Sequence, residues 1–409
     1  MYNPVTPEIV ARLQAIVGAD NVIFDDPERL ESYSHDEIAE KEYAHFPEVV
    51  VKPGSTAEVS QIMQLASKEK IPVTPRGAGS GLSGGAVPVC GGILLSVEKM
   101  NRILEIDLDN LMVVVEPGVV TNDINEELKK HGLFFAGYPM SLQSCFIGGN
   151  VAENAGGGKA IKYGVTGRYI TGLEVVLAGG EVVQFGGKCV KDVTGYNLVQ
   201  LMVGSEGTLG IFTKIIVKLL PLPTAKIDLL ALFPDVEKAI GAVPLMMTKA
   251  RIVPTGIEFM DRLSIVTTHE FLGEKMPYPE TNAVLLIELD GANQEQLLNE
   301  AMAISEILEE HGAIEVYAAE TPDMQEKMWR VRRNIAEAFK AVSPVQSLED
   351  IVVPIAAIPK LMPILARLAE KYDVLIPCYG HAGDGNLHAT PVKKADDTME
   401  RWAEILQIG

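Results

Sequence analysis

Two histidines near the end of the chain have the spacing of a metal site. His381 and His388 lie in YGHAGDGNLH, residues 379–388, with three glycines, an aspartate and an asparagine. A single strand or helix holds two such side chains too far apart to share one ion. A hairpin that turns at Asp384 and Gly385 places them across from each other, at about 5 Å between their Cβ atoms. That spacing suits a divalent cation, although an isolated pair of this kind is more often two hydrogen-bonded surface histidines.

One arginine on a predicted helix is suited to bind a carboxylate. Residues 322–339, PDMQEKMWRVRRNIAEAF, have helical periodicity and contain three arginines. Arg330 and Arg333 have polar or charged helical neighbours, whereas Arg332 has mostly apolar residues three and four positions away. A guanidinium on the apolar face either extends past its neighbours to solvent or meets a buried anion. We expect the second case, with a substrate carboxylate held by two parallel hydrogen bonds.

Three glycine-rich loops in the first half of the chain are suited to bind an extended anion. They are PRGAGSGLSGGA (75–86), IGGNVAENAGGGKAIKYG (147–164) and GSEGTLG (204–210). Alternating glycines allow successive backbone N–H groups to converge on a phosphate, and Arg76 is available to add positive charge. One such loop also suits a hairpin or bulge without a ligand. Three of them together indicate a long ligand, for which a dinucleotide is the natural candidate.

Two common nucleotide-binding motifs do not fit these loops. Gly79, Gly81 and Gly84 form a G-x-G-x-x-G, but a strand-like segment, VPVCGGILLSV, follows them. A Rossmann fold requires a helix at that place. The Walker A pattern also fails, because Lys159 is followed by Ala160. The sequence therefore disfavours a nicotinamide-binding fold and a P-loop.

Two segments near the start of the chain repeat a pattern of strand, Pro-Gly turn and helix. Residues 49–54 and 113–118 each consist of three valines, one charged residue and Pro-Gly, and amphipathic runs follow them to Lys70 and Lys130. Each run has a threonine near its start, an acidic residue in its first turn and a lysine in its last, which suits the helix dipole. We expect two neighbouring βα units.

The chain is long enough for two domains. Its 409 residues exceed what one hydrophobic core usually holds. Pro221 and Pro223 follow an apolar strand and mark the boundary. We therefore predict a first domain over residues 1–222 and a second over residues 223–409. The βαββαβ order of the second domain predicts an antiparallel sheet with helices on one face.

Charge and composition exclude several kinds of partner. The formal net charge of -20 has the same sign as nucleic acids and anionic membranes, which makes both unfavourable ligands. No apolar run approaches the roughly 18 residues needed to span a bilayer, and the first residues lack the pattern of a signal peptide. A soluble cytoplasmic protein is the resulting expectation. The four cysteines form no C-x-x-C pair, so neither a disulfide framework nor an iron–sulfur cluster is expected.

The ordered motifs PRGAGSGLSGGA, GGNVAENAGG, KDVTGYNL and GSEGTLGI resemble the FAD-binding domain of the vanillyl-alcohol oxidase superfamily. Within it, the chain is most similar to the D-lactate dehydrogenases and glycolate oxidase flavin subunits, over nearly its whole length. The resemblance implies an α+β fold, with a two-subdomain FAD-binding domain and a substrate-binding cap domain whose antiparallel sheet is covered by helices. It also implies non-covalent FAD, because residues 75–86 contain no histidine for a covalent link.

The resemblance places FAD on the three glycine-rich loops. It implies that Gly77 to Gly81 lie against the pyrophosphate and that the other two loops lie nearer the rest of the cofactor. The expected cofactor-binding residues are Pro75, Arg76, Gly77, Ala78, Gly79, Ser80, Gly81, Gly148, Gly149, Asn150, Asn154, Gly156, Glu206, Gly207, Gly210 and Ile211.

The resemblance also assigns roles in the second domain. In the family, the two histidines of GHxGDGNxH bind a catalytic zinc, iron or manganese ion, so His381 and His388 are the expected metal ligands. Arg332 is the expected carboxylate clamp, and Asp350 falls at another family motif that supports the pocket. The family completes its metal site with a later Glu-His pair between glycines, which these residues lack. Either the sequence is a fragment, or the metal site and the general base are incomplete.

Together these assignments predict an FAD-dependent 2-hydroxy-acid dehydrogenase. D-Lactate, glycolate or 2-hydroxyglutarate is oxidised by hydride transfer to FAD, while a divalent metal polarises the hydroxyl group. Residues 329–339 and 343–354 look closest to lactate dehydrogenases that work with electron-transferring flavoprotein, which is the expected partner. One alternative is a non-catalytic FAD-binding electron-transfer subunit. Another is a flavoenzyme of ether-lipid synthesis, which the histidine hairpin disfavours.

Overall fold

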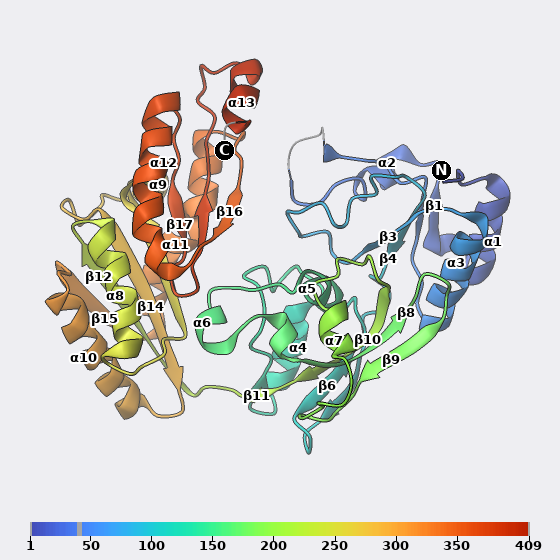
Figure 1. The fold of residues 1–409 in the computed structure, drawn as a ribbon, viewed down its shortest axis with the longest axis horizontal. Helices are drawn as coiled ribbons and strands as arrows, with labels where there is room; N and C mark the ends of the chain where they lie inside the picture. Colours follow the sequence, from blue (N-terminus) through green and yellow to red (C-terminus); the bar gives the residue numbers. More distant parts are fainter. Residues whose placement is uncertain (1, 39–42, 408–409) are drawn as a thin grey trace. The chain divides into compact units, whose positions relative to one another are not determined.

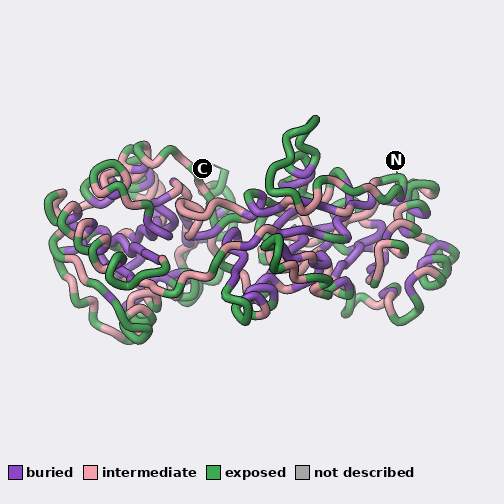
Figure 2. The backbone as a smooth tube through the Cα atoms, turned by 90° about the horizontal axis from the view of Figure 1, so that it is seen from below, coloured by how far each residue is buried: buried purple, intermediate pink, exposed green. Residues whose placement is uncertain are grey.

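The computed structural model describes residues 2–38 and 43–407, which form two compact units. Unit 1 contains Met1–Gly157 and Gly164–Leu222, and unit 2 contains Gly158–Tyr163 and Pro223–Gly409. One change of unit thus falls between Leu222 and Pro223. The chain also enters unit 2 over the short segment Gly158–Tyr163 and then returns to unit 1, which the sequence pattern did not indicate. In both units buried residues gather in the interior, and exposed residues lie on the outside (Figure 2).

The first sheet of unit 1 has four strands and a partly parallel topology (Figure 1). Three of its strands are parallel, and the two central ones are buried on both faces, which explains their apolar sequences. The N-terminal edge strand is antiparallel to its neighbour. The strand order is β1 (Val22–Phe24), β2 (Val49–Val51), β4 (Ile93–Ser96) and β3 (Val73–Arg76), and the helices around this sheet are α1 (Pro7–Val17), α2 (Pro27–Glu31) and α3 (Thr56–Glu69).

The second sheet of unit 1 has five antiparallel strands (Figure 1). Its order is β5 (Ile103–Asp107), β6 (Met112–Val115), β10 (Ile211–Lys218), β8 (Ile170–Val176) and β9 (Val182–Gly186). The helices in this part are α4 (Thr121–Lys129), α5 (Ile147–Glu153) and α7 (Leu198–Met202), and a small pair joins β7 (Leu133–Phe134) to β11 (Leu220–Pro221). Unit 1 therefore consists of two α+β parts.

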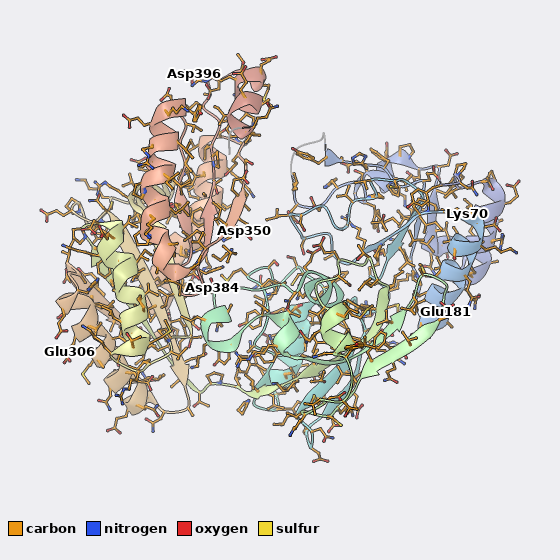
Figure 3. All side chains as sticks on the ribbon, viewed as in Figure 1. Lys70, Glu181, Glu306, Asp350, Asp384 and Asp396 are labelled. Carbon is orange, nitrogen blue, oxygen red and sulfur yellow. The ribbon has the colours of Figure 1, made fainter. Side chains whose placement is uncertain are left out.

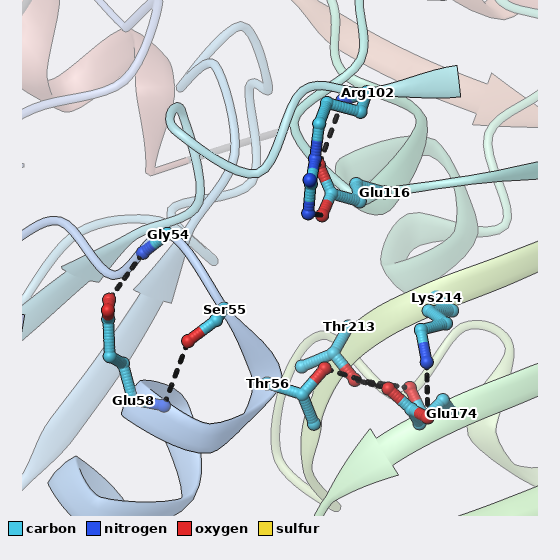
Figure 4. Close-up of polar contacts among 9 residues, drawn as sticks. All are labelled: Gly54, Ser55, Thr56, Glu58, Arg102, Glu116, Glu174, Thr213 and Lys214. Atoms are coloured by element: carbon cyan, nitrogen blue, oxygen red, sulfur yellow. Dashed lines mark hydrogen bonds and ion pairs between the residues drawn. The ribbon is translucent and has the colours of Figure 1, made fainter. Parts of the chain in front are cut away.

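Both predicted βα units are present, with helices that begin at Thr56 and Thr121. At the start of α3, the Ser55 hydroxyl accepts a hydrogen bond from the backbone N–H of Glu58. The Glu58 carboxylate in turn accepts one from the N–H of Gly54, at 2.7 Å (Figure 4). This reciprocal pattern satisfies backbone donors that the first turn of a helix leaves unpaired.

A partly buried carboxylate joins α3 to the second sheet of unit 1. Glu174 on β8 accepts hydrogen bonds from Thr56 of α3 and Thr213 of β10, at 2.8 and 3.0 Å, and pairs with Lys214 at 2.9 Å (Figure 4). Burial would raise the pKa of Glu174, but the hydrogen bonds from Lys214 and the two threonines outweigh it and lower that pKa. The carboxylate therefore stays ionised and fixes α3 against the second sheet.

Unit 2 is built on one seven-stranded sheet in which every neighbouring pair is antiparallel, as predicted. The strands near the end of the chain join this sheet by pairing with a strand from the middle of the chain (Figure 1). The order is β15 (Glu315–Ala319), β12 (Ala225–Phe233), β14 (Ala283–Gly291), β13 (Gly256–Asp261), β17 (Cys378–His381), β18 (Asn386–Ala389) and β16 (Glu349–Val352). The short helix α6 (Ala160–Tyr163) and the terminal helix α13 (Met399–Leu406) also belong to this unit.

Helices cover both faces of this sheet, so the prediction of helices on one face is wrong. One face packs against α8 (Val236–Thr248), α10 (Gln294–Glu310) and α12 (Ile358–Tyr372). The other packs against α9 (Arg262–Phe271) and α11 (Pro322–Val342). The strands β12 and β14 are buried on both sides and contain the apolar runs LLALF and AVLLI, so no alternation there showed that two faces were covered. No helix within residues 2–38 and 43–407 is long and apolar enough to cross a membrane.

A fully buried aspartate interrupts the apolar face under α11. Asp228 on β12 accepts a hydrogen bond from the Trp329 indole at 2.9 Å, and Lys226 lies 3.3 Å away. Within the described residues its Oδ1 has no hydrogen-bond partner. Burial raises the pKa of Asp228 to about 6, which Lys226 opposes and the charge of Glu288 reinforces.

We expect Asp228→Asn to remove a pH-dependent cost of folding. Because the folded pKa of about 6 lies above the ordinary value of 3.8, ionisation of Asp228 weakens the fold as pH rises through this window. The shift corresponds to about 3 kcal/mol of unfolding free energy between about pH 4 and 7. Urea unfolding followed by tryptophan fluorescence reports on unit 2, since Trp329 and Trp402 both lie there. Equal pH slopes for the variant and the parent protein would contradict the expectation.

Candidate functional site

The three glycine-rich loops come together in unit 1. The first follows β3, the second forms the start of α5 and the third follows α7. A Cβ added to Gly77 would lie 3.5 Å from the backbone nitrogen of Gly149, so the first two loops are in contact. A Cβ added to Gly207 would collide with the ring of Pro75, which places the third loop against the first. The loops therefore form one continuous backbone surface.

Part of this surface is open to a ligand. A Cβ added to Gly81 or Gly149 meets no heavy atom of the described residues within 4 Å, so a ligand can approach the backbone closely there. The far end of the first loop is different, because Gly85 lies beside the carboxylates of Glu153 and Glu206. Burial, and then the charge of Glu206, raises the pKa of Glu153. A pyrophosphate fits the first half of the loop better than this acidic end.

Arg76 supports the first loop from behind. The side chain is buried, and its guanidinium donates to the backbone oxygens of His35, Ala86 and Ser32, at 2.7, 3.3 and 3.3 Å. Gly79 has a φ of 74°, and a Cβ at this position would collide with that guanidinium. The arginine therefore holds the loop in shape through main-chain contacts. Its predicted contact with a phosphate stays a prediction.

Other residues of the predicted FAD set are used by the fold itself. Asn150 donates to the Thr121 hydroxyl at 2.7 Å, and the Asn154 side-chain oxygen accepts from the N–H of Gly167 at 2.8 Å. Three glycines of the set pack against neighbouring residues: Gly148 against Pro117, Gly156 against Val165 and Gly210 against Val175. Ala78 and Ser80 lie in the first loop. Ile211 is the first residue of β10. The backbone of the loops, more than these side chains, is what remains available to a cofactor.

The two predicted catalytic histidines lie on a hairpin of unit 2, but in a different register from the prediction. His381 pairs with Asn386, and His388 pairs with Tyr379. The loop between the strands has four residues, 382–385, instead of a two-residue turn at Asp384 and Gly385. The two imidazoles are therefore diagonal neighbours on one face, with ring centroids 5.7 Å apart. Figure 3 labels Asp384 at this turn.

Glu258 completes this cluster, and sequence reasoning missed it. The residue lies on β13 directly opposite His381 and is 1% exposed. One carboxylate oxygen is 2.6 Å from His381 Nδ1, and the other accepts from Arg332 Nε at 2.7 Å. Burial would raise the pKa of Glu258, but the positive charge of Arg332 and the hydrogen bond to His381 hold it at about 2. The available signal was a single charged residue in the apolar segment 252–260.

Arg332 extends from α11 into the same cluster and is buried, whereas Arg330 and Arg333 form surface pairs. Its guanidinium carbon lies 5.1 Å from the ring centroid of Tyr379. Within the described residues its hydrogen bonds are confined to Nε and Glu258. The two terminal nitrogens are therefore available for a bidentate contact with a ligand carboxylate.

His388 lies at the other side of the cluster, opposite Asp350 of β16, and Figure 3 labels Asp350. The Asp350 carboxylate accepts from Asn386 at 2.6 Å and lies 3.4 Å from His388 Nδ1. That ring nitrogen is buried and has no hydrogen-bond partner among the described residues. Burial lowers the pKa of His388 to about 4. Burial acts in the same direction on His381, but the hydrogen bond and the negative charge of Glu258 outweigh it and raise the pKa of His381. His388 is therefore neutral near neutral pH.

The donor set for a divalent metal is incomplete. His381 resembles a metal ligand in one respect, because a carboxylate holds its Nδ1 and leaves Nε2 for another contact. A catalytic zinc site normally has three protein ligands. Among residues 2–38 and 43–407, no group of three or more His, Cys, Asp or Glu side chains is arranged to hold a metal ion. His381 and His388 therefore stay predicted metal ligands.

The end of the second glycine loop covers the Glu258 cluster. Gly158 lies so close that an added Cβ would collide with the Glu258 carboxylate and lie 3.3 Å from His381 Nδ1. Lys159 pairs with Glu288 at 2.9 Å, and Lys162 donates to the backbone oxygen of Asp290 at 2.7 Å. The residues that follow this loop's glycines therefore belong to unit 2.

Comparisons with known proteins agree with this arrangement. Residues 47–186 match the family described as FAD binding domain, and residues 222–407 match the family of C-terminal domains of FAD linked oxidases. The chain is 40% identical to the glycolate oxidase subunit GlcD of Bacillus subtilis, over 98% of this chain and 86% of that protein. The chain belongs to the FAD-linked oxidases. The predicted family, among D-lactate dehydrogenases and glycolate oxidase flavin subunits, is thereby confirmed.

Other relatives of this FAD-linked oxidase extend the comparison. It is 39% identical to a D-lactate dehydrogenase of Anaerostipes hadrus, over 95% of this chain and 82% of that protein. Solved structures of p-cresol methylhydroxylase and alkyldihydroxyacetonephosphate synthase superpose with TM-scores of 0.81 and 0.80 at 18% and 19% identity. Both alignments cover the whole chain, and 88% and 80% of the respective structures. At such identities they show the fold alone, and together with the two family matches they confirm the predicted fold class.

Proposed function

We propose that this FAD-linked oxidase converts a small D-2-hydroxy acid, such as D-lactate or glycolate, into the 2-oxo acid. Relatives named glycolate oxidase subunit and D-lactate dehydrogenase support this choice of substrate. The observation that carries it is the buried Arg332, whose terminal nitrogens have no partner among the described residues. A buried cation beside two imidazoles suits an acid with a hydroxyl next to its carboxylate.

Different residues of unit 2 bind the substrate and remove its hydroxyl proton. Arg332 Nη1 and Nη2 hold the substrate carboxylate, and Glu258 and the Tyr379 ring keep the guanidinium in place. His381 Nε2 takes the hydroxyl proton, because Glu258 stabilises the imidazolium that forms. His388 offers a neutral ring nitrogen as a second hydrogen-bond acceptor. When bound, FAD supplies the acceptor for the hydride that leaves the α-carbon.

The predicted metal stays a proposal. A divalent ion held by His381 and His388 would polarise the substrate hydroxyl group, and the scheme above assigns no step to it. Metal analysis of the purified protein by mass spectrometry tests this directly. We expect activity to persist after treatment with a chelator; complete loss that zinc, iron or manganese restores would assign the two histidines to a metal after all.

Anaerobic reduction of the flavin tests the proposed function. We expect D-lactate, glycolate or D-2-hydroxyglutarate to bleach the flavin absorbance near about 450 nm. L-Lactate is the control for configuration, and propionate, which lacks the hydroxyl, is the control for chemistry. No bleaching by any of the three acids, in protein that holds FAD and that dithionite reduces, would refute the proposal and favour a non-catalytic FAD-binding subunit.

The electron acceptor is proposed from sequence likeness alone. Electron-transferring flavoprotein remains the expected partner, because residues 329–339 and 343–354 resemble those of lactate dehydrogenases that work with this protein. Reoxidation of the substrate-reduced enzyme by purified electron-transferring flavoprotein, measured against reoxidation by oxygen, is the corresponding assay.

A further inference from the structure

We propose that Glu258 is a positioning residue that decides which atoms of Arg332 and His381 face the substrate. This inference rests on the proposed function. Its physical basis is that one carboxylate contacts both side chains at once, at 2.7 Å from Arg332 Nε and 2.6 Å from His381 Nδ1. No motif of the sequence pointed to this residue, and its role follows from the contacts alone.

An ionised carboxylate can only accept hydrogen bonds, so both of its neighbours must donate. The neutral imidazole of His381 therefore carries its hydrogen on Nδ1 and has its lone pair on Nε2. The guanidinium likewise uses Nε toward Glu258, which leaves its two terminal nitrogens for a carboxylate. A single residue thus sets the tautomer of the proton acceptor and the orientation of the anion clamp.

The surroundings of Glu258 make this arrangement rigid. The residue is 1% exposed and sits on the central strand β13, with His381 directly across on β17. Arg332 reaches it from α11, and the backbone at Gly158 covers it from unit 2's short inserted segment. Water has little access, so the two contacts are not exchanged for solvent.

The variant Glu258→Gln distinguishes a positioning role of Glu258 from a purely space-filling one. Glutamine has one oxygen and one NH2 group, so it cannot accept from both neighbours. If its oxygen stays with the charged Arg332, its NH2 donates to His381 Nδ1 and forces the hydrogen onto Nε2. The lone pair needed for the hydroxyl proton is then lost. Glu258→Asp keeps two acceptor oxygens but is one methylene shorter, so we expect it to restore part of the activity.

The tautomer of His381 is the readout that a structural role would not change. Nitrogen-15 spectra of histidine-labelled, FAD-loaded protein, recorded at a pH high enough to deprotonate the ring, distinguish the two tautomers. The signals are assigned by their loss in His381→Gln. We expect Nδ1–H in the parent protein and Nε2–H in Glu258→Gln, together with a fall in kcat of at least about 100-fold and a smaller change in KM.

A buried carboxylate elsewhere in unit 2 provides a matched control. Asp397 is 7% exposed, pairs with Arg401 at 3.0 Å and accepts a hydrogen bond from the backbone N–H of Lys394 at 3.4 Å. Asp397→Asn removes a comparable buried charge, so we expect it to keep the His381 tautomer and kcat within about threefold.

A second variant tests the inference without altering Glu258. Gly158→Ala places a methyl group against the Glu258 carboxylate, and position 158 has no positive φ to strain the backbone. We expect it to shift the His381 tautomer and lower kcat in the same direction as Glu258→Gln. Gly187→Ala in unit 1, where an added Cβ meets nothing within 4 Å among the described residues, is its control.

The outcomes separate this inference from the proposed function. If the parent protein oxidises an acid and Glu258→Gln does so equally well with an unchanged tautomer, the positioning role is refuted. If the parent protein oxidises none of the acids, the proposed function fails. The tautomer comparison then still decides whether Glu258 sets the His381 ring.

Discussion

Replacing Arg332 with alanine should lower kcat/KM for the 2-hydroxy acid by about 100-fold to 1,000-fold, mainly through KM, with FAD retained. The side chain is buried, and removing one partner of a buried charge pair or bidentate carboxylate contact costs several kcal/mol. Steady-state kinetics with the acid that bleaches the flavin measure the loss. The flavin-to-protein absorbance ratio checks FAD, which the loops of unit 1 are expected to hold.

Two further variants make the Arg332 result specific. Arg332→Ala also leaves Glu258 without its cation, which destabilises unit 2. Arg332→Lys keeps that charge pair but cannot hold a carboxylate bidentately, so an intermediate loss is expected. Arg333→Ala, on the same helix but in a surface pair with Glu326, should change kcat/KM by less than about twofold. Unaltered KM in both Arg332 variants would contradict the assignment of this residue as the clamp.

Replacing Gly79 with alanine should weaken FAD binding by at least about 100-fold. Its φ of 74° costs a residue with a Cβ about 1 to 2 kcal/mol. The added methyl group would also displace the Arg76 guanidinium from the carbonyls of His35, Ala86 and Ser32, which shape the loop. Titration of apoprotein with FAD, followed by flavin fluorescence, measures the affinity.

Gly81 separates a deformed loop from a blocked cofactor. It has no positive φ, and an added Cβ meets no described atom within 4 Å, so Gly81→Ala should leave the stability of the apoprotein unchanged. A loss of FAD affinity in this variant then reports direct contact between the loop and the cofactor. Full FAD affinity in Gly79→Ala would show that the loop does not bind FAD in the conformation described here.

Local patterns predicted the elements that depend on neighbouring residues in the chain. The valine runs and their Pro-Gly turns indicated β2, α3, β6 and α4, because strand, turn and cap preferences act over a few residues. The glycine loops could be recognised for the same reason. The strand after Gly84, which argued against a Rossmann fold, is present as β4, although only over Ile93–Ser96.

Such local patterns could not predict the register of the histidine hairpin or the coverage of both sheet faces by helices. The hairpin of His381 and His388 was expected with a two-residue turn, but the structure has four residues there, which moves the pairing by two positions. Pairing of β17 with β13, more than a hundred residues earlier in the chain, determines that outcome. In the same way, coverage of both sheet faces depends on where α9 and α11 return, and continuous apolar strands do not show this.

The sequence by itself determined the family, the glycine-rich loops and the residue types that can bind an acid. Those properties depend on motifs that are contiguous in the chain. Only the tertiary structure decided that Arg332 and His381 share one carboxylate, that this carboxylate is Glu258 and that the segment around Gly158 covers it. The physical reason is that hydrogen bonds act over about 3 Å in space, irrespective of distance along the chain, so strand pairing and helix packing bring these partners together.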